Sequence, residues 1–339
     1  MKTARLGRTG LTVNKDGLGA LPLQRCTTNE AVHLIRECVD FGMNFIDTAL
    51  FYTDSEEKLG LALEGRRSDV VIATKTFASD GDTLRQDLET SLWILKTDYI
   101  DIYQFHNPGF VPRPGGEDGL YDACLEAKRQ DKIRFIGISN HKIHLAREAE
   151  ESGLYDTIQF PFSYLATEAE IKLALDCVRL DVGFIAMKAL SGGLVTDVGA
   201  ARAWLNQYDN VVPIWGLQRT DELDKLKTAI NAGDELTSEH ATKIEADRKE
   251  LAGDFCRGCG YCMPCPAGIE INNAARASVF IRRAPKSMWL GWEDMMEKIE
   301  DCIHCGQCAA KCPYGLNAAE MLPRNLADYR EIYNQTTTD

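Results

Sequence analysis

Short apolar runs alternate with helical patterns through the first two thirds of the chain. The apolar runs are unbroken, which is typical of strands buried on both faces of a parallel sheet. Eight such runs lie near residues 16–20, 45–48, 70–75, 100–106, 135–139, 157–160, 183–188 and 211–215. Helical patterns follow them at residues 31–41, 55–63, 83–95, 120–130, 144–151, 168–180, 200–207 and 220–232. Eight strand-then-helix units in about 235 residues predict an α/β fold of the (β/α)8 TIM-barrel type.

A doubly wound parallel sheet is the competing α/β fold. Its phosphate-binding fingerprint, G-x-G-x-x-G, is missing after the first strand, so the barrel is favoured. A hairpin-like stretch, Arg5–Gly19, opens the chain and turns at Gly7 and Gly10. After the barrel, predicted for residues 1–235, a highly charged segment predicts a helical connector at 236–253. We expect residues 254–335 to form a separate, cysteine-rich module.

The cysteines of this chain are unevenly placed. Four are scattered among apolar neighbours, where we expect reduced core residues: Cys26, Cys38, Cys124 and Cys177. The other eight of the twelve fall between Cys256 and Cys312. Disulfides rarely persist in the cytosol, so a group this concentrated predicts a set of metal ligands.

Two cysteine runs share one spacing pattern. The first contains Cys256, Cys259, Cys262 and Cys265 before Pro266, and the second contains Cys302, Cys305, Cys308 and Cys312 before Pro313. Three thiolates at two-residue gaps can wrap three corners of an iron–sulfur cubane, and a Cys-Pro ending sends the fourth thiolate to the other cluster. The second run matches the bacterial ferredoxin pattern fully, whereas the first has one residue fewer before its last cysteine.

These runs predict two [4Fe–4S] clusters in a ferredoxin-like module. By the crossover rule, the ligands of the first cluster are Cys256, Cys259, Cys262 and Cys312, and those of the second are Cys302, Cys305, Cys308 and Cys265. Zinc is the alternative, because paired C-x2-C is also a zinc spacing. Zinc sites usually separate two pairs by a longer span, so two uninterrupted quartets favour iron–sulfur clusters.

The composition indicates which partners to expect. The formal net charge is −13, which argues against nucleic acid or an anionic membrane as a partner. No apolar stretch approaches the ~20 residues of a membrane helix, and no apolar run follows the first residues as in a signal peptide. We therefore expect a cytoplasmic protein. Its oligomeric state cannot be inferred from the sequence.

Polar residues of four kinds stand at the ends of the predicted strands. Asp47 and Tyr52 follow the second strand, Lys75 ends the third, and His106 ends the fourth. The functional face of such a barrel is the carboxyl end of its strands, so these side chains should converge. The pKa of an unperturbed tyrosine is about 10, and a neighbouring ammonium favours the phenolate and lowers it. A carboxylate can hold that ammonium and an imidazole can orient a carbonyl, so the group predicts a proton-donor site for carbonyl reduction.

Residues 1 to about 235 resemble the aldo-keto reductase family. The segments 47–52, 72–75 and 101–106 match its tetrad with Asp47, Tyr52, Lys75 and His106, and the opening segment 6–10 resembles its hairpin over the barrel floor. The resemblance implies that a small carbonyl or related unsaturated compound is reduced with NAD(P)H and that Tyr52 donates the proton. The cysteine-rich region resembles the dicluster ferredoxin-like extension of a subset of these proteins.

The resemblance also assigns residues to the nicotinamide cofactor. Ser139, Asn140 and Gln159 match the residues that hold the carboxamide. Leu190 and Gly192 belong to a loop that resembles the one over the pyrophosphate. Gly216, Gln218 and Arg219 belong to a loop that resembles the one at the 2′-phosphate and adenine. Met187 stands where the family usually stacks an aromatic residue on the nicotinamide. Lys225 and Leu226 replace the usual glutamate and asparagine near adenine. Arg219 favours NADPH over NADH, because an arginine can pair with a 2′-phosphate.

Three functions are compatible with these features. The first is an NAD(P)H-dependent reductase whose clusters carry or gate electrons. The second is a ferredoxin-linked reductase, in which a ferredoxin or another electron carrier feeds the clusters without direct hydride transfer. Exchange between a hydride donor and single-electron clusters needs a two-electron carrier such as a flavin, for which no motif is visible. The third is a nucleotide-binding redox sensor or interaction subunit, against which the complete tetrad argues.

Overall fold

The computed structural model describes residues 2–251, 255–283, 286 and 289–337, and it divides into two compact units. We call them the barrel unit, Met1–Ala189 with Val198–His240, and the cysteine unit, Leu190–Asp197 with Ala241–Asp339. The segment 190–197 thus groups with the cysteine unit, although it lies between barrel elements in the chain. The boundary predicted at residues 253 and 254 lies outside the described residues, and the one predicted at residue 235 stays a prediction.

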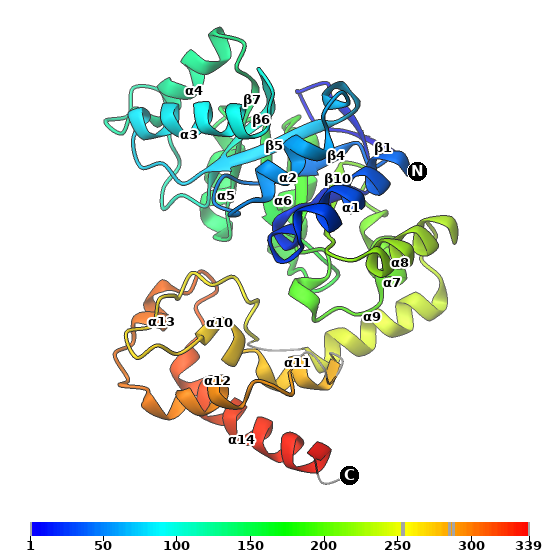
Figure 1. Ribbon diagram of the computed structural model, residues 1–339, viewed down its shortest axis with the longest axis vertical. Helices are drawn as coiled ribbons and strands as arrows, with labels where there is room; N and C mark the ends of the chain where they lie inside the picture. The colour runs from blue at the N-terminus through cyan, green and yellow to red at the C-terminus, as the bar shows by residue number, and fades with distance from the viewer. Residues whose placement is uncertain (1, 252–254, 284–285, 287–288, 338–339) are drawn as a thin grey trace. The chain divides into compact units, whose positions relative to one another are not determined.

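Parallel strands close into a barrel in the barrel unit (Figure 1). The strands are β3 (Gly17–Gly19), β4 (Phe45–Asp47), β5 (Val71–Thr76), β6 (Ile100–His106), β7 (Ile133–Ser139), β8 (Thr157–Pro161), β9 (Gly183–Met187) and β10 (Val211–Gly216). Each pairs with the next in chain order, and β10 pairs with β3 through Trp215 and Leu18. The predicted (β/α)8 barrel is therefore confirmed. A doubly wound sheet is excluded because that sheet is open.

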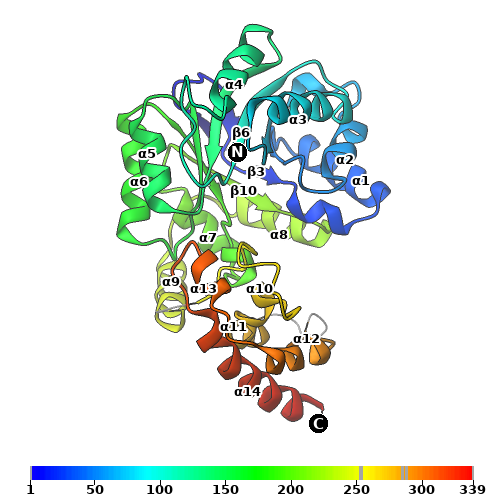
Figure 2. The ribbon, with the colours of Figure 1, turned by 90° about the vertical axis from the view of Figure 1, so that its left-hand side faces the viewer.

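Helices follow the strands and surround the barrel (Figure 2). They are α1 (Thr28–Asp40), α2 (Ser55–Ala62), α3 (Gly81–Ile94), α4 (Leu120–Arg129), α5 (Ile143–Glu151), α6 (Glu168–Arg179), α7 (Val198–Leu205) and α8 (Thr220–Asn231). A capping box starts α1, because the Thr27 backbone N–H donates to Glu30 Oε2 at 2.9 Å while the Thr27 side chain accepts from the Glu30 backbone. Short 3₁₀ turns are η1 (Leu21–Arg25), η2 (Arg67–Asp69), η3 (Ser191–Gly193) and η5 (Lys298–Asp301).

A two-stranded hairpin precedes the barrel, as the sequence predicts, but it spans residues 3–14 and not Arg5–Gly19, since residues 17–19 form the first barrel strand. Its strands β1 (Thr3–Arg5) and β2 (Thr12–Asn14) are antiparallel. Gly7 has a φ of +49°, and a Cβ there would lie 2.3 Å from the backbone nitrogen of Gly183, so the turn needs glycine. Leu6 and Val13 are fully buried and pack with the inward-facing residues of the barrel strands. The hairpin therefore fills the barrel floor with apolar side chains.

The cysteine unit is built from helices and irregular loops. Its helices are α9 (Ser238–Glu250, which begins in the barrel unit), α10 (Ile271–Ala274), α11 (Ala277–Arg283), α12 (Glu293–Glu297), α13 (Gln307–Lys311) and α14 (Ala318–Thr337). Trp289 and Tyr329 are 2% exposed and pack in its own apolar core, where the Tyr329 hydroxyl donates to the Trp289 carbonyl at 3.2 Å. This unit therefore has a core separate from that of the barrel.

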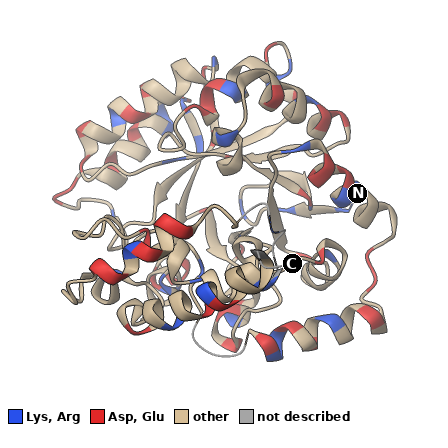
Figure 3. Cartoon of the chain, turned by 60° about the horizontal axis from the view of Figure 1, so that its bottom comes forward, with Lys and Arg blue, Asp and Glu red and all other residues tan. Residues whose placement is uncertain are grey.

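Acidic and basic residues are interspersed along the helices (Figure 3). Many form pairs between neighbouring elements, such as Arg85 with Glu126 at 3.1 Å. Among the described residues, no helix is long and apolar enough to span a membrane.

Candidate active site and cysteine hollows

The four side chains of the predicted tetrad lie together at the carboxyl ends of β4, β5 and β6. Asp47, Lys75 and His106 stand on those strands, and Tyr52 follows β4 in the loop before α2. Lys75 Nζ lies 2.7 and 2.8 Å from the two carboxylate oxygens of Asp47 and 5.3 Å from the centroid of the Tyr52 ring. The rings of Tyr52 and His106 meet edge-on, with centroids 5.7 Å apart. The barrel therefore brings all four to one mouth.

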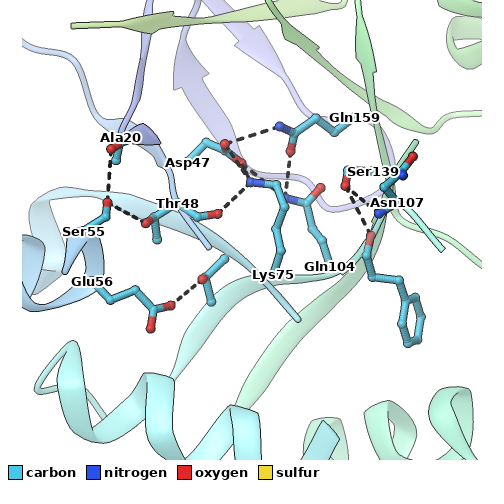
Figure 4. A network of polar contacts seen from close by, with 12 residues as sticks. Ala20, Asp47, Thr48, Ser55, Glu56, Lys75, Gln104, Asn107, Ser139 and Gln159 are labelled. Carbon is cyan, nitrogen blue, oxygen red and sulfur yellow. Dashed lines mark hydrogen bonds and ion pairs between the residues drawn. The ribbon is translucent and has the colours of Figure 1, made fainter. Parts of the chain in front are cut away.

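Asp47 and Lys75 form a buried ion pair (Figure 4). Asp47 is 2% exposed and Lys75 is 1% exposed. Burial lowers the pKa of Lys75, and the carboxylate of Asp47 opposes that shift. Burial likewise raises the pKa of Asp47, opposed by the charge of Lys75. Lys75 Nζ also donates to the Thr48 carbonyl at 2.6 Å, so three oxygens fix the direction of its ammonium.

Two glutamines complete the surroundings of Asp47 (Figure 4). Gln104 Nε2 lies 3.4 Å from Asp47 Oδ1 and donates to Gln159 Oε1 at 2.9 Å, and Gln159 Nε2 donates to Asp47 Oδ2 at 3.3 Å. Sequence reasoning assigned Gln159 to the carboxamide and missed Gln104. The signal for Gln104 was available, since a polar residue two positions before His106 in an apolar strand faces the same side as His106.

His106 is held as a neutral imidazole. Burial, reinforced by the positive charge of Lys75, places the pKa of His106 well below its usual 6.5. Phe77 stacks on its ring with centroids 3.9 Å apart and an interplanar angle of 19°. Among the described residues, Nδ1 of His106 has no hydrogen-bond partner. A neutral imidazole keeps one N–H, which can donate to a carbonyl oxygen.

Exposed aromatic side chains extend from this mouth. Phe51 is 71% exposed and meets Phe77 edge-on, with ring centroids 5.0 Å apart. Phe77 in turn contacts His106, as above. These rings therefore offer an apolar wall beside the tetrad.

The structure places Ser139 and Asn140, the predicted carboxamide residues, at the end of β7. Ser139 pairs in register with His106 and donates from Oγ to the Phe105 carbonyl at 3.3 Å. Asn140 donates from Nδ2 to the Pro108 carbonyl at 3.0 Å and accepts from the Lys142 backbone at 2.8 Å. Both side chains are buried and hold the loop after β6 beside the tetrad.

The residues assigned to the rest of the dinucleotide are divided between the two units. Met187 ends β9 and packs against the apolar barrel core, and Gly216 ends β10. Leu190 and Gly192 belong to the cysteine unit.

The expected 2′-phosphate loop is held by its own acidic residues. The Arg219 guanidinium pairs with Asp221 at 2.9 Å and with Glu222 at 2.7 Å, and the Gln218 backbone donates to Glu222 at 2.8 Å. Two carboxylates therefore already neutralise Arg219, and a 2′-phosphate has to compete with them.

The cysteines of the two runs line two hollows in the cysteine unit. Hollow A is lined by Cys256, Cys259 and Cys262 of the first run and by Cys308 and Cys312 of the second. Hollow B is lined by Cys302, Cys305 and Cys308 of the second run and by Cys262 and Cys265 of the first. Each hollow is thus lined by three thiols of one run and two of the other, and the last thiol of the other run is one of those two.

The donor set and the backbone around the hollows fit an iron–sulfur cubane. Gly258, Gly260 and Gly306 have φ values of +62°, +79° and +71°, which glycine adopts without strain. The Gly258 N–H lies 3.4 Å from Cys256 Sγ, the kind of hydrogen bond that tunes a cluster thiolate. Among the described residues, no three His, Cys, Asp or Glu side chains lie close enough together to hold a single metal ion. A cubane is larger than a single ion, so its four thiolates need to surround the cluster and do not need to meet at one point.

Two family models match the chain. The aldo/keto reductase family matches residues 16–202, and the 4Fe-4S dicluster domain matches residues 255–317. The first match covers more than half of the chain, and the second covers both cysteine runs.

Relatives and solved structures agree with these matches. L-galactose dehydrogenase of Arabidopsis thaliana is 31% identical over 213 residues, which cover 57% of this chain and 67% of that protein. The uncharacterized oxidoreductase YqkF of Bacillus subtilis is 29% identical over 211 residues, covering 58% and 67%. The holo form of aldo-keto reductase AKR11C1 from Bacillus halodurans has a TM-score of 0.64 at 23% identity, over 73% of this chain and 96% of that one. An aldo-keto reductase from Klebsiella pneumoniae in complex with NADPH has a TM-score of 0.62 at 23% identity, over 72% and 94%. Similarity at that identity shows the barrel fold.

The family match, the closed barrel and the cysteine pattern point to one conclusion. This oxidoreductase chain belongs to the aldo/keto reductase family and carries a 4Fe-4S dicluster domain after its barrel.

Proposed function

We propose that the chain reduces a small carbonyl compound at the barrel mouth, with Tyr52 as the proton donor. The observation that carries the proposal is the arrangement around Tyr52, with the Lys75 ammonium 5.3 Å from its ring centroid and the neutral His106 at its edge. When bound, NAD(P)H supplies the hydride that the carbonyl carbon receives. Ser139, Asn140 and Gln159 are the residues that would hold its carboxamide.

The protein's own residues then manage the carbonyl oxygen and its proton. His106 donates its N–H to that oxygen and orients the carbonyl. Tyr52 gives its proton to the oxygen as negative charge develops there, and the product is an alcohol. The phenolate left on Tyr52 is stabilised by Lys75, whose ammonium Asp47 and the Thr48 carbonyl hold in place.

The proposed role of Tyr52 is tested by Tyr52→Phe, which removes only the hydroxyl. Loss of a general acid lowers turnover by about 10²- to 10⁴-fold, and we expect nucleotide affinity to change less than about twofold. Tyr99→Phe is the matched control, since Tyr99 precedes β6 at the opposite end from His106 and contacts Arg67 and Arg134. If Tyr52→Phe turns over every tested carbonyl as fast as the unmodified chain, the proposal is wrong and a nucleotide-binding sensor becomes the better assignment.

We further propose that the hollows hold two [4Fe–4S] clusters. The first would be ligated by Cys256, Cys259, Cys262 and Cys312, and the second by Cys302, Cys305, Cys308 and Cys265. The linings of the two hollows support this division. Iron and sulfide analysis after anaerobic purification should find about eight irons per chain. Cofactor extraction from the same sample would show whether nicotinamide or flavin is bound.

The crossover of ligands has its own test. Cys312→Ser should disturb the cluster held by the first cysteine run, and Cys265→Ser the cluster held by the second, as read from the electron paramagnetic resonance of the reduced protein. If each substitution disturbs only the cluster of its own run, the crossover is wrong.

A second candidate function is a reductase fed through the clusters by a ferredoxin or another one-electron carrier. The exposure of hollow B favours it, because Cys305 is exposed and Ile303 is 65% exposed. The hollows also share Cys262 and Cys308 in their linings, so two clusters there would be neighbours. A hydride carries two electrons and a cluster accepts one, so exchange with nicotinamide needs a carrier such as a flavin.

Anaerobic mixing with NADPH separates the two functions. Reduced-cluster signals after NADPH alone would mean that the clusters exchange electrons with the nicotinamide. Reduction only by dithionite or ferredoxin, followed by substrate turnover, would favour the second function.

A further inference from the structure

The loop between β9 and α7 packs within the cysteine unit. Residues 190–197 group with that unit, and the loop contains the turn η3 (Ser191–Gly193), which we call the glycine loop. Gly192 and Gly193 have φ values of +68° and +94°, so the turn depends on glycine at both positions. The loop therefore has a defined shape, and its partners lie near the first cysteine run.

One guanidinium contacts both the glycine loop and the cysteine run of hollow A. Arg276 Nη2 donates to the Gly192 carbonyl at 2.7 Å. Its Nη1 fills the space beside Gly258, where a Cβ would lie only 2.4 Å away. The Arg257 carbonyl lies on the same side of the loop, 3.4 Å from where a Cβ of Gly192 would be. Arg276 and the backbone between Cys256 and Cys259 thus form one surface against the glycine loop.

Two stacked aromatic rings lie against this guanidinium. Arg276 lies over the Phe280 ring at 4.8 Å, and Phe280 stacks on Trp292 with centroids 5.1 Å apart and an angle of 12°. Stacking on an aromatic face restricts a planar guanidinium. Groups of the cysteine unit therefore orient Arg276.

We propose that Arg276 is a positioning residue that holds the glycine loop in its nucleotide-binding shape and so couples nucleotide affinity to occupancy of hollow A. The proposal rests on the proposed function, because the resemblance to the family is what places the glycine loop over the pyrophosphate. A cluster held by Cys256 and Cys259 fixes the backbone at Gly258 and keeps Arg276 against Gly192. An empty hollow A frees that backbone and releases Arg276. By linkage, bound nucleotide stabilises the loaded cluster by the same factor.

The test measures NADPH dissociation constants under anaerobic conditions for the full-length chain, with and without its iron, in unmodified and Arg276→Ala forms. Loss of one hydrogen bond from a charged donor corresponds to about tenfold. Iron removal should weaken NADPH binding about tenfold in the unmodified chain and less than about twofold in Arg276→Ala. Arg276→Ala should also raise the KM for NADPH while kcat stays within about twofold.

Two further variants serve as controls. Arg282→Ala removes an arginine of α11, the helix that follows Arg276, where it pairs with Asp328, and it should leave NADPH affinity unchanged. Arg276→Lys keeps the charge but not the planar fork, so it should recover part of the affinity. An equal effect of iron removal in the unmodified and Arg276→Ala chains would overturn the proposal.

Hydrogen exchange of peptides covering residues 190–197, measured without nucleotide, separates this proposal from the proposed function. Exchange should be about tenfold faster in Arg276→Ala and in the iron-free chain. If no form binds NADPH, the proposed function fails while the exchange data still decide whether Arg276 holds the loop. If the exchange of residues 190–197 is unchanged in Arg276→Ala, Arg276 does not hold the loop and the inference is wrong.

Discussion

The barrel unit and the cysteine unit place their reactive side chains in different ways. In the barrel, Asp47, Lys75 and His106 stand on strands whose backbones pair with each other, and the ion pair is completed by protein groups. In the cysteine unit, the thiols lie in loops and in the short helix α13, around two hollows. We expect the first site to be organised before anything binds, and the second to depend on the group that its cysteines are proposed to hold. The two units should therefore respond differently to loss of metal and to loss of a partner side chain.

Removal of iron should have the largest effect and should be confined to the cysteine unit. Without metal, Cys262 and Cys308, both buried, border empty space and lose their contacts on that side. We expect residues 255–337 to become sensitive to protease and their helical circular dichroism to fall. The thermal midpoint of the barrel should move by less than about 2 °C. If iron removal unfolded the barrel unit together with the cysteine unit, the proposed difference between the two units would be wrong.

Lys75→Met should be the most damaging single change in the barrel. It leaves Asp47 buried and charged without its partner, which lowers the free energy of unfolding by about 3–5 kcal/mol. Urea denaturation, monitored by the fluorescence of the barrel unit, would measure this change in the free energy of unfolding. Lys132→Met is the control, because Lys132 pairs with Glu89 at the surface, and such exposed pairs contribute less than about 1 kcal/mol. Equal losses in the two variants would mean that the buried pair does not organise the barrel site.

Gln104→Leu should have a smaller effect on the same site. The substitution removes an amide donor from Asp47 and from Gln159 Oε1, so both lose a buried partner. We expect the free energy of unfolding to fall by about 1–3 kcal/mol. The iron content of the cysteine unit should be unchanged. A variant as stable as the unmodified chain would show that Gln104 only fills space.

The smallest effect expected is a dependence of barrel stability on pH. Burial raises the pKa of Glu150 to about 7, whereas an unfolded glutamate has a pKa of about 4.3. The folded chain keeps this proton to higher pH than the unfolded chain does, so stability falls as pH rises from about 4.5 to about 7.

Glu150→Gln replaces the carboxyl group with an amide that cannot ionise, so it should flatten the dependence of barrel stability on pH. Urea denaturation at several pH values across this range would measure it, with the iron–sulfur absorbance recorded at the same time. That absorbance should not follow the barrel transition. An unchanged slope in the variant would assign the pH dependence to another group.

Much of the barrel could be predicted from local sequence. β6 was predicted with the bounds that the structure shows, Ile100–His106, because an unbroken apolar run buried on both faces has few alternatives. The start of α1 was predictable for a local reason too, since Thr27 and Glu30 cap the helix across only three residues. The tetrad followed from counting strand ends, because parallel strands bring those ends to one face.

The contacts that refine these sites were not predictable in the same way. Gln104 and Gln159 are 55 residues apart in the chain, and Gln159 and Asp47 are 112 apart. Arg219 resembled a phosphate ligand in the sequence, but in the fold it is paired with Asp221 and Glu222. Which polar groups meet is decided by register and side-chain direction, and local patterns do not contain that information.

The sequence by itself determined the candidate groups for chemistry, namely eight cysteines in two runs and four polar residues at or just after strand ends. It did so because metal-ligand spacing and strand–helix alternation are short-range patterns. Only the tertiary structure decided how those groups are supported: Gln104 at Asp47, Phe77 on His106, and Arg276 against Gly192. Hydrogen bonds and ring contacts between distant residues depend on separations of a few ångströms, which exist only after the chain has closed its barrel and packed its cysteine loops.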